Sequence, residues 1–258
     1  MKHIHLDKIK TLECAPKKIN IFSTKEIEMI KEFYNILPEI TFNKKQNVRK
    51  KPWQQNFNKE LDKMYFSRLK EALGDYKMDS LKSDKGEDYY GLFHESFSPL
   101  PMHVDSGFDE ETIIYKQVVT PLVGPGDTIF FKKRWYGKST TFTIDKDELN
   151  FKPKPGQNDR SCAHLGSKEF DKEFHKKYLA HIDINNLKGM EVEMIYEWKI
   201  GESLIVDRTH IHCSSSRITR VNSLPFSVPT TGVSCGAPAA SRCSAVRLSL
   251  EIVITPTC

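Results

Sequence analysis

The chain has 258 residues and a formal net charge of +5, with 38% hydrophobic and 28% charged residues. Such a length accommodates one large β domain or two smaller domains, and the apolar content is that of a folded protein. No apolar run approaches the roughly 18 residues of a membrane span, and the mild positive charge does not by itself indicate a nucleic-acid partner. The N-terminus has no apolar signal core, so a cytoplasmic protein is expected.

Residues 1–87 are predicted to be mainly helical. Ser23 and Glu26 form a capping box that starts the first helix, whose apolar residues recur at helical spacing until Pro38 ends it. Asn58 is suited to begin a second helix and Gly74 to end it. We expect both helices to support a sheet within the same domain, and the basic run KKQNVRKKPW to be a solvated loop.

From about residue 88 the pattern changes to short strands. Strand-like stretches are DYYGLFHESF, TIIYKQVVTPL, TIFF, YGKSTTFTI, VEMIYEW, SLIVD and HIHC. Residues 145–180 are predicted to interrupt them as an insertion, with a polar loop followed by a helix in KEFDKEFHKKYLAHI. Many short strands separated by turn signals favour a barrel or jelly roll over residues 88–220.

Residues 221–258 differ in composition from the rest. The last lysine is Lys199, and three of the six cysteines fall in this tail. Either it is a natural flexible linker leading to a final strand, RLSLEIVI, or it reflects an altered reading frame. No cysteines form a C-x-x-C pair, so free thiols are expected rather than a structural zinc site.

One H-x-D motif is placed to bind a metal. The pattern occurs three times, beginning at His5, His103 and His181. The first precedes the helices and the sheet, and the last leaves too few residues before His210 for strands to wrap around a site. His103 and Asp105 alone have a strand before them and several strands, then a late histidine, after them.

The late histidine is His210 or His212, which lie two apart on one predicted strand and so share a face. Two neutral imidazoles and one carboxylate form the ligand set of non-haem Fe(II) oxygenases, which leaves positions open for substrate and oxygen. Spacing alone does not decide between the two histidines.

The stretch WKIGESLIVDRTHIHCSS is similar to the distal-histidine segment of Fe(II)/2-oxoglutarate-dependent oxygenases, in particular prolyl-hydroxylase-like and phage-type members. The resemblance covers residues 88–220. It implies a mainly β double-stranded β-helix (a cupin-like jelly roll) with flanking helices, and Fe(II) bound by His103, Asp105 and His212. It further implies 2-oxoglutarate as cosubstrate, and a dioxygenase activity that hydroxylates a substrate while forming succinate and CO2.

The resemblance also implies a basic residue about ten positions beyond the distal histidine, to bind the far carboxylate of 2-oxoglutarate. Asn222 occupies that place. The nearest cations are Arg220, the better candidate, and Arg217. Tyr115 is a further candidate to contact the cosubstrate from a neighbouring strand.

Two other functions fit the same residues. A cupin-like hydrolase or isomerase uses the three ligands for Zn(II), and a degenerate barrel binds an acidic partner through its basic N-terminal region. The substrate, a small molecule or a protein side chain, is not readable from the sequence, and neither is the oligomeric state; no membrane or nucleic-acid partner is expected.

Overall fold

The structure is a computed structural model that describes residues 10, 13–38, 41–43, 48–54, 57–78, 81–82, 88–89, 91–105, 116–136, 140–143, 157–159, 166–216 and 247–256. Its helices are α2 (Thr24–Ile36), α3 (Lys59–Leu73), α4 (Lys172–Tyr178) and the 3₁₀ helix η2 (Ile184–Leu187). The early strands are β1 (Lys17–Asn20), β2 (Thr41–Asn43), β3 (Val48–Trp53), β4 (Tyr76–Met78), β5 (Leu81–Lys82) and β6 (Asp88–Tyr89). The later strands are β7 (Gly91–Ser96), β8 (His103–Val104), β9 (Lys116–Val123), β10 (Asp127–Arg134), β11 (Thr140–Thr143), β12 (Gln157–Asp159), β13 (Val192–Glu197), β14 (Glu202–Asp207), β15 (His210–Ser214) and β16 (Arg247–Pro256).

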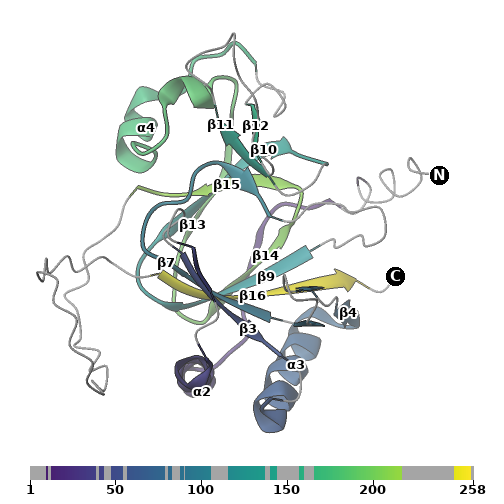
Figure 1. The fold of residues 1–258 in the computed structure, drawn as a ribbon. Helices are drawn as coiled ribbons and strands as arrows, with labels where there is room; N and C mark the ends of the chain where they lie inside the picture. Colours follow the sequence, from purple (N-terminus) through teal and green to yellow (C-terminus); the bar gives the residue numbers. More distant parts are fainter. Residues whose placement is uncertain are drawn as a thin grey trace, which may run out of the picture.

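Two sheets face each other across the molecule (Figure 1). The larger has the order β1-β14-β9-β16-β7-β3-β2, with β4 beside β16, and the smaller has the order β12-β11-β8-β15-β10-β13. Antiparallel pairs nest within one another along the chain, as β7 with β16, β8 with β15, β9 with β14 and β10 with β13. This nesting is the topology of a double-stranded β-helix, so the predicted fold class is confirmed.

The final strand lies in the middle of the larger sheet. Arg247–Ile252 pair with β7 on one side, and Leu248–Ile254 pair with β9 on the other. The stretch RLSLEIVI is therefore a strand that joins the two halves of this sheet. Residues 217–246 lie outside the described residues, and the domain boundaries at 87 and 220 stay a prediction.

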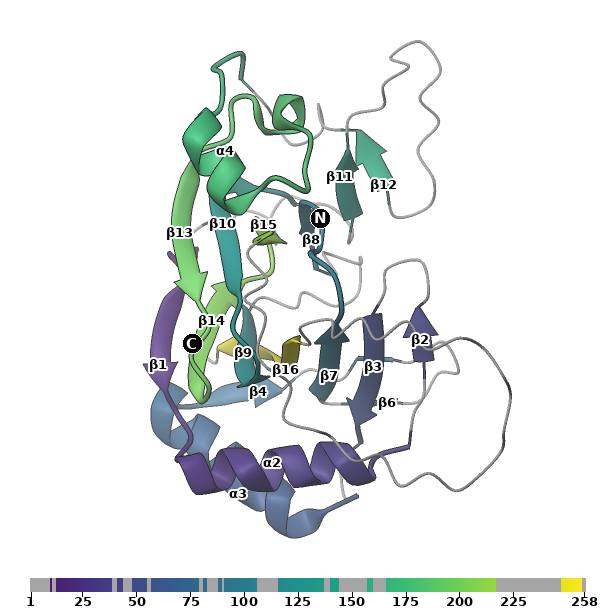
Figure 2. The same cartoon turned by 90° about the vertical axis from the view of Figure 1, so that its left-hand side faces the viewer.

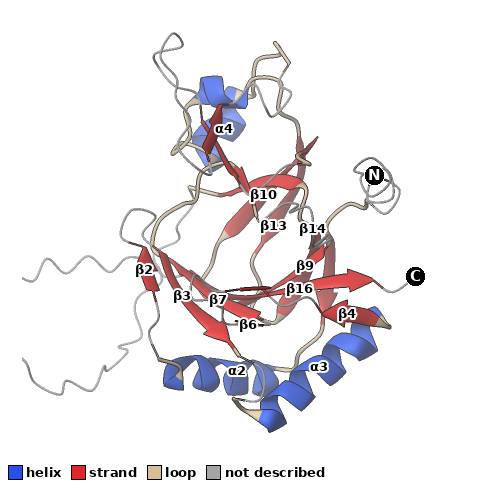
Figure 3. Ribbon diagram, turned by 45° about the vertical axis from the view of Figure 1, so that its right-hand side comes forward, coloured by secondary structure: helices blue, strands red, loops and turns tan. Residues whose placement is uncertain are grey.

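The two N-terminal helices cover the outer face of the larger sheet (Figure 3). Both predicted caps are present: Ser23 and Glu26 form the capping box of α2, and Asn58 accepts a hydrogen bond from Leu61 N at the start of α3. Aromatic rings fill the layer between helices and sheet, with Trp53 stacked on Phe93 at a centroid separation of 6.0 Å. Burial of this layer is the main stabilising contribution that the helices make.

The prediction of a solvated loop at KKQNVRKKPW is wrong for its second half, which forms β3. Lys51 is 8% exposed, and its ammonium group donates to the Tyr34 carbonyl at 3.0 Å and lies 4.2 Å from the Tyr34 ring centroid. These two contacts with Tyr34 on α2 offset the cost of burying the Lys51 charge. The charge pattern of the sequence does not indicate them.

The predicted helix near residue 170 is confirmed in part, as α4 followed by the short η2. Together they cover the outer side of the smaller sheet, where Phe170, Tyr178 and Leu187 are buried. Most of the predicted insertion loop at 145–160 lies outside the described residues. Within the described ranges, every helix is too short or too polar to cross a membrane.

Candidate metal centre

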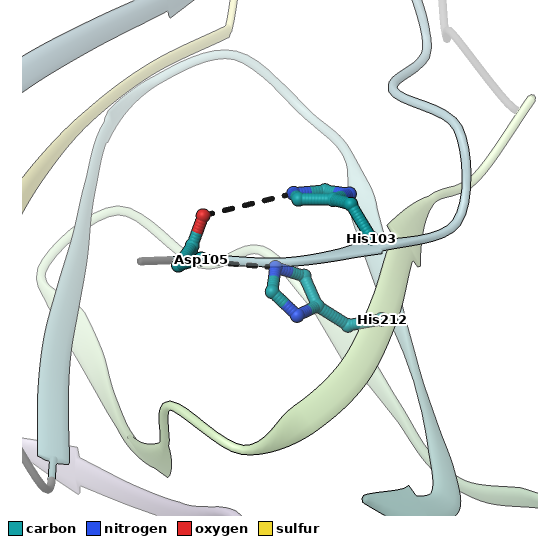
Figure 4. A group of neighbouring side chains, drawn as sticks. All are labelled: His103, Asp105 and His212. Atoms are coloured by element: carbon teal, nitrogen blue, oxygen red, sulfur yellow. Dashed lines mark ion pairs between the residues drawn. The ribbon is translucent and has the colours of Figure 1, made fainter. Parts of the chain in front are cut away.

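The nested strand pairing places His103 and His212 together. They come from β8 and β15, which lie side by side in the smaller sheet (Figure 2), and the two residues are Cα partners across that antiparallel pair. Asp105 follows directly after the end of β8. All three side chains converge on one point (Figure 4), although they lie far apart in the sequence.

The distances within this group suit a shared metal ion. The His103 Nε2 atom lies 3.8 Å from Asp105 Oδ1, and the His212 Nε2 atom lies 3.5 Å from Asp105 Oδ2. One ligand atom from each residue lies within 4.8 Å of the other two. Bonds of about 2 Å to a common ion need neighbouring ligand atoms roughly 3–4 Å apart, so small rotations of the side chains complete the site.

Backbone carbonyl groups fix the orientation of both imidazoles. The Nδ1 atom of His103 lies 2.7 Å from the Pro101 carbonyl oxygen, and the Nδ1 atom of His212 lies 3.0 Å from the His210 carbonyl oxygen. A carbonyl oxygen only accepts hydrogen bonds, so each Nδ1 carries the proton and donates it. Each Nε2 is then left with a lone pair directed at the shared point, as in a metal-binding histidine.

The charges also fit a divalent cation. Burial, with a smaller contribution from His212, lowers the pKa of His103 to about 4, so this imidazole is neutral at pH 7. Burial alone raises the pKa of Asp105, but attraction by His212, His103 and Arg208 outweighs it and holds that pKa well below its usual range. The group thus presents a neutral imidazole beside an ionised carboxylate, as metal ligation requires.

His210 lies outside this group. Its side chain is fully buried, and its Nε2 atom lies 2.7 Å from Glu193 Oε2. Burial, with smaller contributions from Arg134 and His212, lowers its pKa to about 2. Of the two histidines that the spacing left open, the structure brings His212 to His103 and Asp105.

A cavity between the two sheets adjoins the three residues. Its volume is about 70 Å³, and a single water needs roughly 10–15 Å³ by the same measure. Besides the three residues, polar side chains of the larger sheet line it: His94, Ser96, Gln117, Arg247 and Ser249. Apolar side chains from both sheets also line it: Leu204 and Val206 from β14 of the larger sheet, and Phe130 from β10 of the smaller sheet.

Arg247 and Ser249 were not predicted from the sequence, and the predicted candidates Tyr115, Arg217 and Arg220 lie outside the described residues. Arg247 is 3% exposed and begins β16, and Ser249 points to the same side two residues later. The alternation of polar and apolar residues in RLSL carries the signal for this arrangement. This alternation was not used for prediction because residues 221–258 differ in composition from the rest of the chain.

Comparisons with known proteins found solved structures that are similar to this chain in fold. No protein-family model matches the sequence, and no curated protein matches it. HygX from Streptomyces hygroscopicus, solved with nickel, 2-oxoglutarate and hygromycin B bound, is 11% identical, with 99% of this chain and 87% of that chain covered at a TM-score of 0.45.

Two further solved structures are similar. SnoN, a non-heme alpha ketoglutarate dependent epimerase from nogalamycin biosynthesis, is 9% identical, with coverage of 98% and 83% and a TM-score of 0.45. EctD from S. alaskensis, in its apoform, is 11% identical, with coverage of 93% and 72% and a TM-score of 0.39. Because these identities and TM-scores are low, we draw the function of this chain from its own side chains.

Proposed function

We propose that this protein is an Fe(II)- and 2-oxoglutarate-dependent dioxygenase that hydroxylates its substrate. The observation that carries the proposal is the convergence of His103, Asp105 and His212, with both Nε2 atoms directed inward by backbone acceptors. Two imidazoles and one carboxylate on one side of an ion leave its other positions open, which distinguishes this ligand set from closed structural sites.

The three ligands would hold Fe(II), which when bound supplies oxygen activation coupled to decarboxylation of a 2-oxo acid. The anionic Asp105 neutralises only half of the charge on a divalent ion. The remaining positive charge favours an anionic 2-oxo acid as the next ligand. The hydrogen bonds from both Nδ1 atoms hold the two imidazoles in the orientation that such binding would need.

Arg247 is our candidate to bind the far carboxylate of 2-oxoglutarate. It lies on the final strand and lines the cavity that adjoins His103, Asp105 and His212. A guanidinium group binds a carboxylate through two parallel hydrogen bonds, and burial strengthens such a pair. Ser249, on the same side of β16, offers a hydroxyl donor to the same anion. Arg220 and Arg217 are therefore our lesser candidates.

The apolar side chains of Phe130, Leu204 and Val206 offer water in the cavity no hydrogen-bond partner. Exclusion of water strengthens the electrostatic interactions inside and protects reactive species from side reactions.

The test is oxygen-dependent conversion of 2-oxoglutarate to succinate with added Fe(II). We expect turnover by the wild type and none by His103→Ala. His181→Ala is the matched control, because His181 also begins an H-x-D motif but contacts the Leu100 carbonyl oxygen instead of the metal group. Equal turnover in wild type and His103→Ala contradicts the proposal. Metal-dependent activity that needs neither oxygen nor a 2-oxo acid would instead support a hydrolase or isomerase.

A further inference from the structure

We propose that Gly126 is a positioning residue for cosubstrate binding, because its missing side chain leaves the space in which the Arg247 guanidinium lies. This inference rests on the proposed function, in which Arg247 binds the far carboxylate of 2-oxoglutarate. It concerns a residue that binds no ligand and lies before β10, far from Arg247 in the sequence.

The Arg247 side chain lies so close to the Gly126 backbone that no room is left for a Cβ atom at position 126. A Cβ atom on Gly126 would lie 2.7 Å from Arg247 Nε, 3.0 Å from Cδ and 3.2 Å from Cζ. Carbon atoms without a bond between them are at their lowest energy at about 3.5–4.0 Å. An alanine here therefore displaces the arginine side chain by a sizeable fraction of an ångström.

The backbone conformation does not explain this glycine. Gly124, two residues earlier in the same turn, has a φ of 89°, a conformation that disfavours other residues. Gly126 is not among the described glycines with positive φ. Its backbone thus accepts an alanine, and the limiting factor is the space that Arg247 occupies.

Two other groups act on the guanidinium, one through a hydrogen bond and one through its charge. Its Nη2 atom donates to the Ser215 carbonyl oxygen at 2.9 Å, and the Ser215 amide in turn donates to the Asp127 carbonyl oxygen at 2.8 Å. Asp127 is 8% exposed, and the negative charge of its carboxylate favours the charged form of Arg247 against the cost of burial. Gly126, Asp127 and Ser215 together form a cradle that sets where the guanidinium points.

The direction of a guanidinium matters more than its charge when it binds a carboxylate through two hydrogen bonds. Both bonds weaken steeply as their geometry departs from linear. A guanidinium moved by an added methyl group keeps its charge but loses this alignment. The expected consequence is weaker binding of 2-oxoglutarate with an unchanged metal site.

The experiment measures the dissociation constant of 2-oxoglutarate by calorimetry, with Zn(II) in place of iron so that no turnover occurs. We expect Gly126→Ala to raise this constant by about tenfold, as loss of one charged hydrogen bond does, and to leave Zn(II) affinity and Tm close to wild type. In the iron enzyme, KM for 2-oxoglutarate rises while kcat at saturation is retained. Gly166→Ala is the matched control, since a Cβ there makes only an ordinary contact at 3.6 Å.

A double-mutant cycle separates the cradle from a general disturbance of the turn. In an Arg247→Ala background no guanidinium is left to displace, so Gly126→Ala should add no further loss of affinity. If Gly126→Ala weakens 2-oxoglutarate binding by the same factor with and without Arg247, the proposal is overturned. A wild-type dissociation constant in Gly126→Ala alone would also overturn it. If the wild type itself binds no 2-oxoglutarate, the proposed function fails and the role of the cradle in binding fails with it.

Discussion

The two faces of the larger sheet differ sharply although they belong to the same strands. The face toward α2 and α3 is apolar and rich in aromatic rings, with Phe93, Val118, Ile205, Leu248 and Leu250 among its buried residues. The face toward the cavity is mixed: it carries the polar residues His94, Ser96, Gln117, Arg247 and Ser249 beside the apolar residues Val119, Leu204 and Val206. Successive residues of a strand point to opposite faces, so each strand contributes to both.

This division separates stability from chemistry within single strands. In β16 the two leucines at 248 and 250 pack under the helices, whereas Arg247 and Ser249 face the cavity. A substitution on one face should therefore change the free energy of unfolding, and a substitution on the other should change ligand binding. The following experiments test that separation in order of decreasing expected effect.

The largest effect is expected for His212→Ala. Removing one of the three proposed ligands should abolish turnover and weaken Fe(II) or Zn(II) binding by more than about a hundredfold, since changes to groups that only support a ligand already cost 10–100-fold. Tm without metal should stay close to wild type. Calorimetric metal titration checks this result, with His181→Ala as control; unchanged metal affinity in His212→Ala would remove this residue from the site.

The next effect is a loss of stability on the helix-facing side. Leu250→Ala should lower the free energy of unfolding by about 3 kcal/mol, because it opens a cavity in a fully buried layer. Urea unfolding measures this change. The 2-oxoglutarate affinity of the folded protein should stay the same, and Ser249→Ala, its neighbour on the other face, should show the reverse pattern. Similar effects of the two variants on both quantities would contradict the separation of faces.

A smaller effect is expected for Arg247→Met, which keeps much of the apolar stem and removes the charge. Loss of a charged hydrogen-bonded partner costs about 2 kcal/mol, which corresponds to roughly a thirtyfold rise in the dissociation constant of 2-oxoglutarate. Metal affinity should be retained. An unchanged dissociation constant would return Arg220 or Arg217 to consideration as the anchor.

The smallest effect concerns the cap of α2. Ser23→Ala should lower the free energy of unfolding by about 1 kcal/mol at pH 7, because a helix N-terminus loses its acceptor. Burial alone raises the pKa of Glu26, but hydrogen bonds from Ser23 and Arg68 outweigh it and lower this pKa.

A lowered pKa in the folded state contributes stability that is present at neutral pH and lost as the pH falls below the ordinary value of 4.5. The difference between wild type and Ser23→Ala should therefore shrink in acid. Urea unfolding at pH 7 and in acid measures it, and a difference that grows on acidification would contradict this account.

The helix starts and the convergence of the three candidate metal ligands were predictable because their signals are local and chemical. Ser23 and Asn58 are caps that act within four residues, and His103 with Asp105 forms a spaced motif whose partner had to lie on a late strand. The choice of His212 over His210 depends on which imidazole faces β8, and a spacing of two residues cannot decide that. Resemblance supplied that choice, and the structure places His212 beside His103.

The positions of β3 and Arg247 were not predicted because both depend on contacts with residues far away in the sequence. The sequence of β3 is typical of a basic loop, because the carbonyl group and ring of Tyr34 that contact the Lys51 ammonium lie on α2. Arg247 reads as part of an anomalous tail because its place between β7 and β9 depends on strands more than a hundred residues earlier. Neither environment is encoded near the residue itself.

The central position of β16 also constrains how the protein is made. Until this strand is in place, β7 and β9 both present open edges, and such edges invite pairing with other chains. The larger sheet therefore closes only after the chain has been synthesised past β16, through contacts of high sequence separation that form slowly. A nascent chain halted before residue 247 would contain His103, Asp105 and His212 but an unclosed barrel, and we expect it to aggregate.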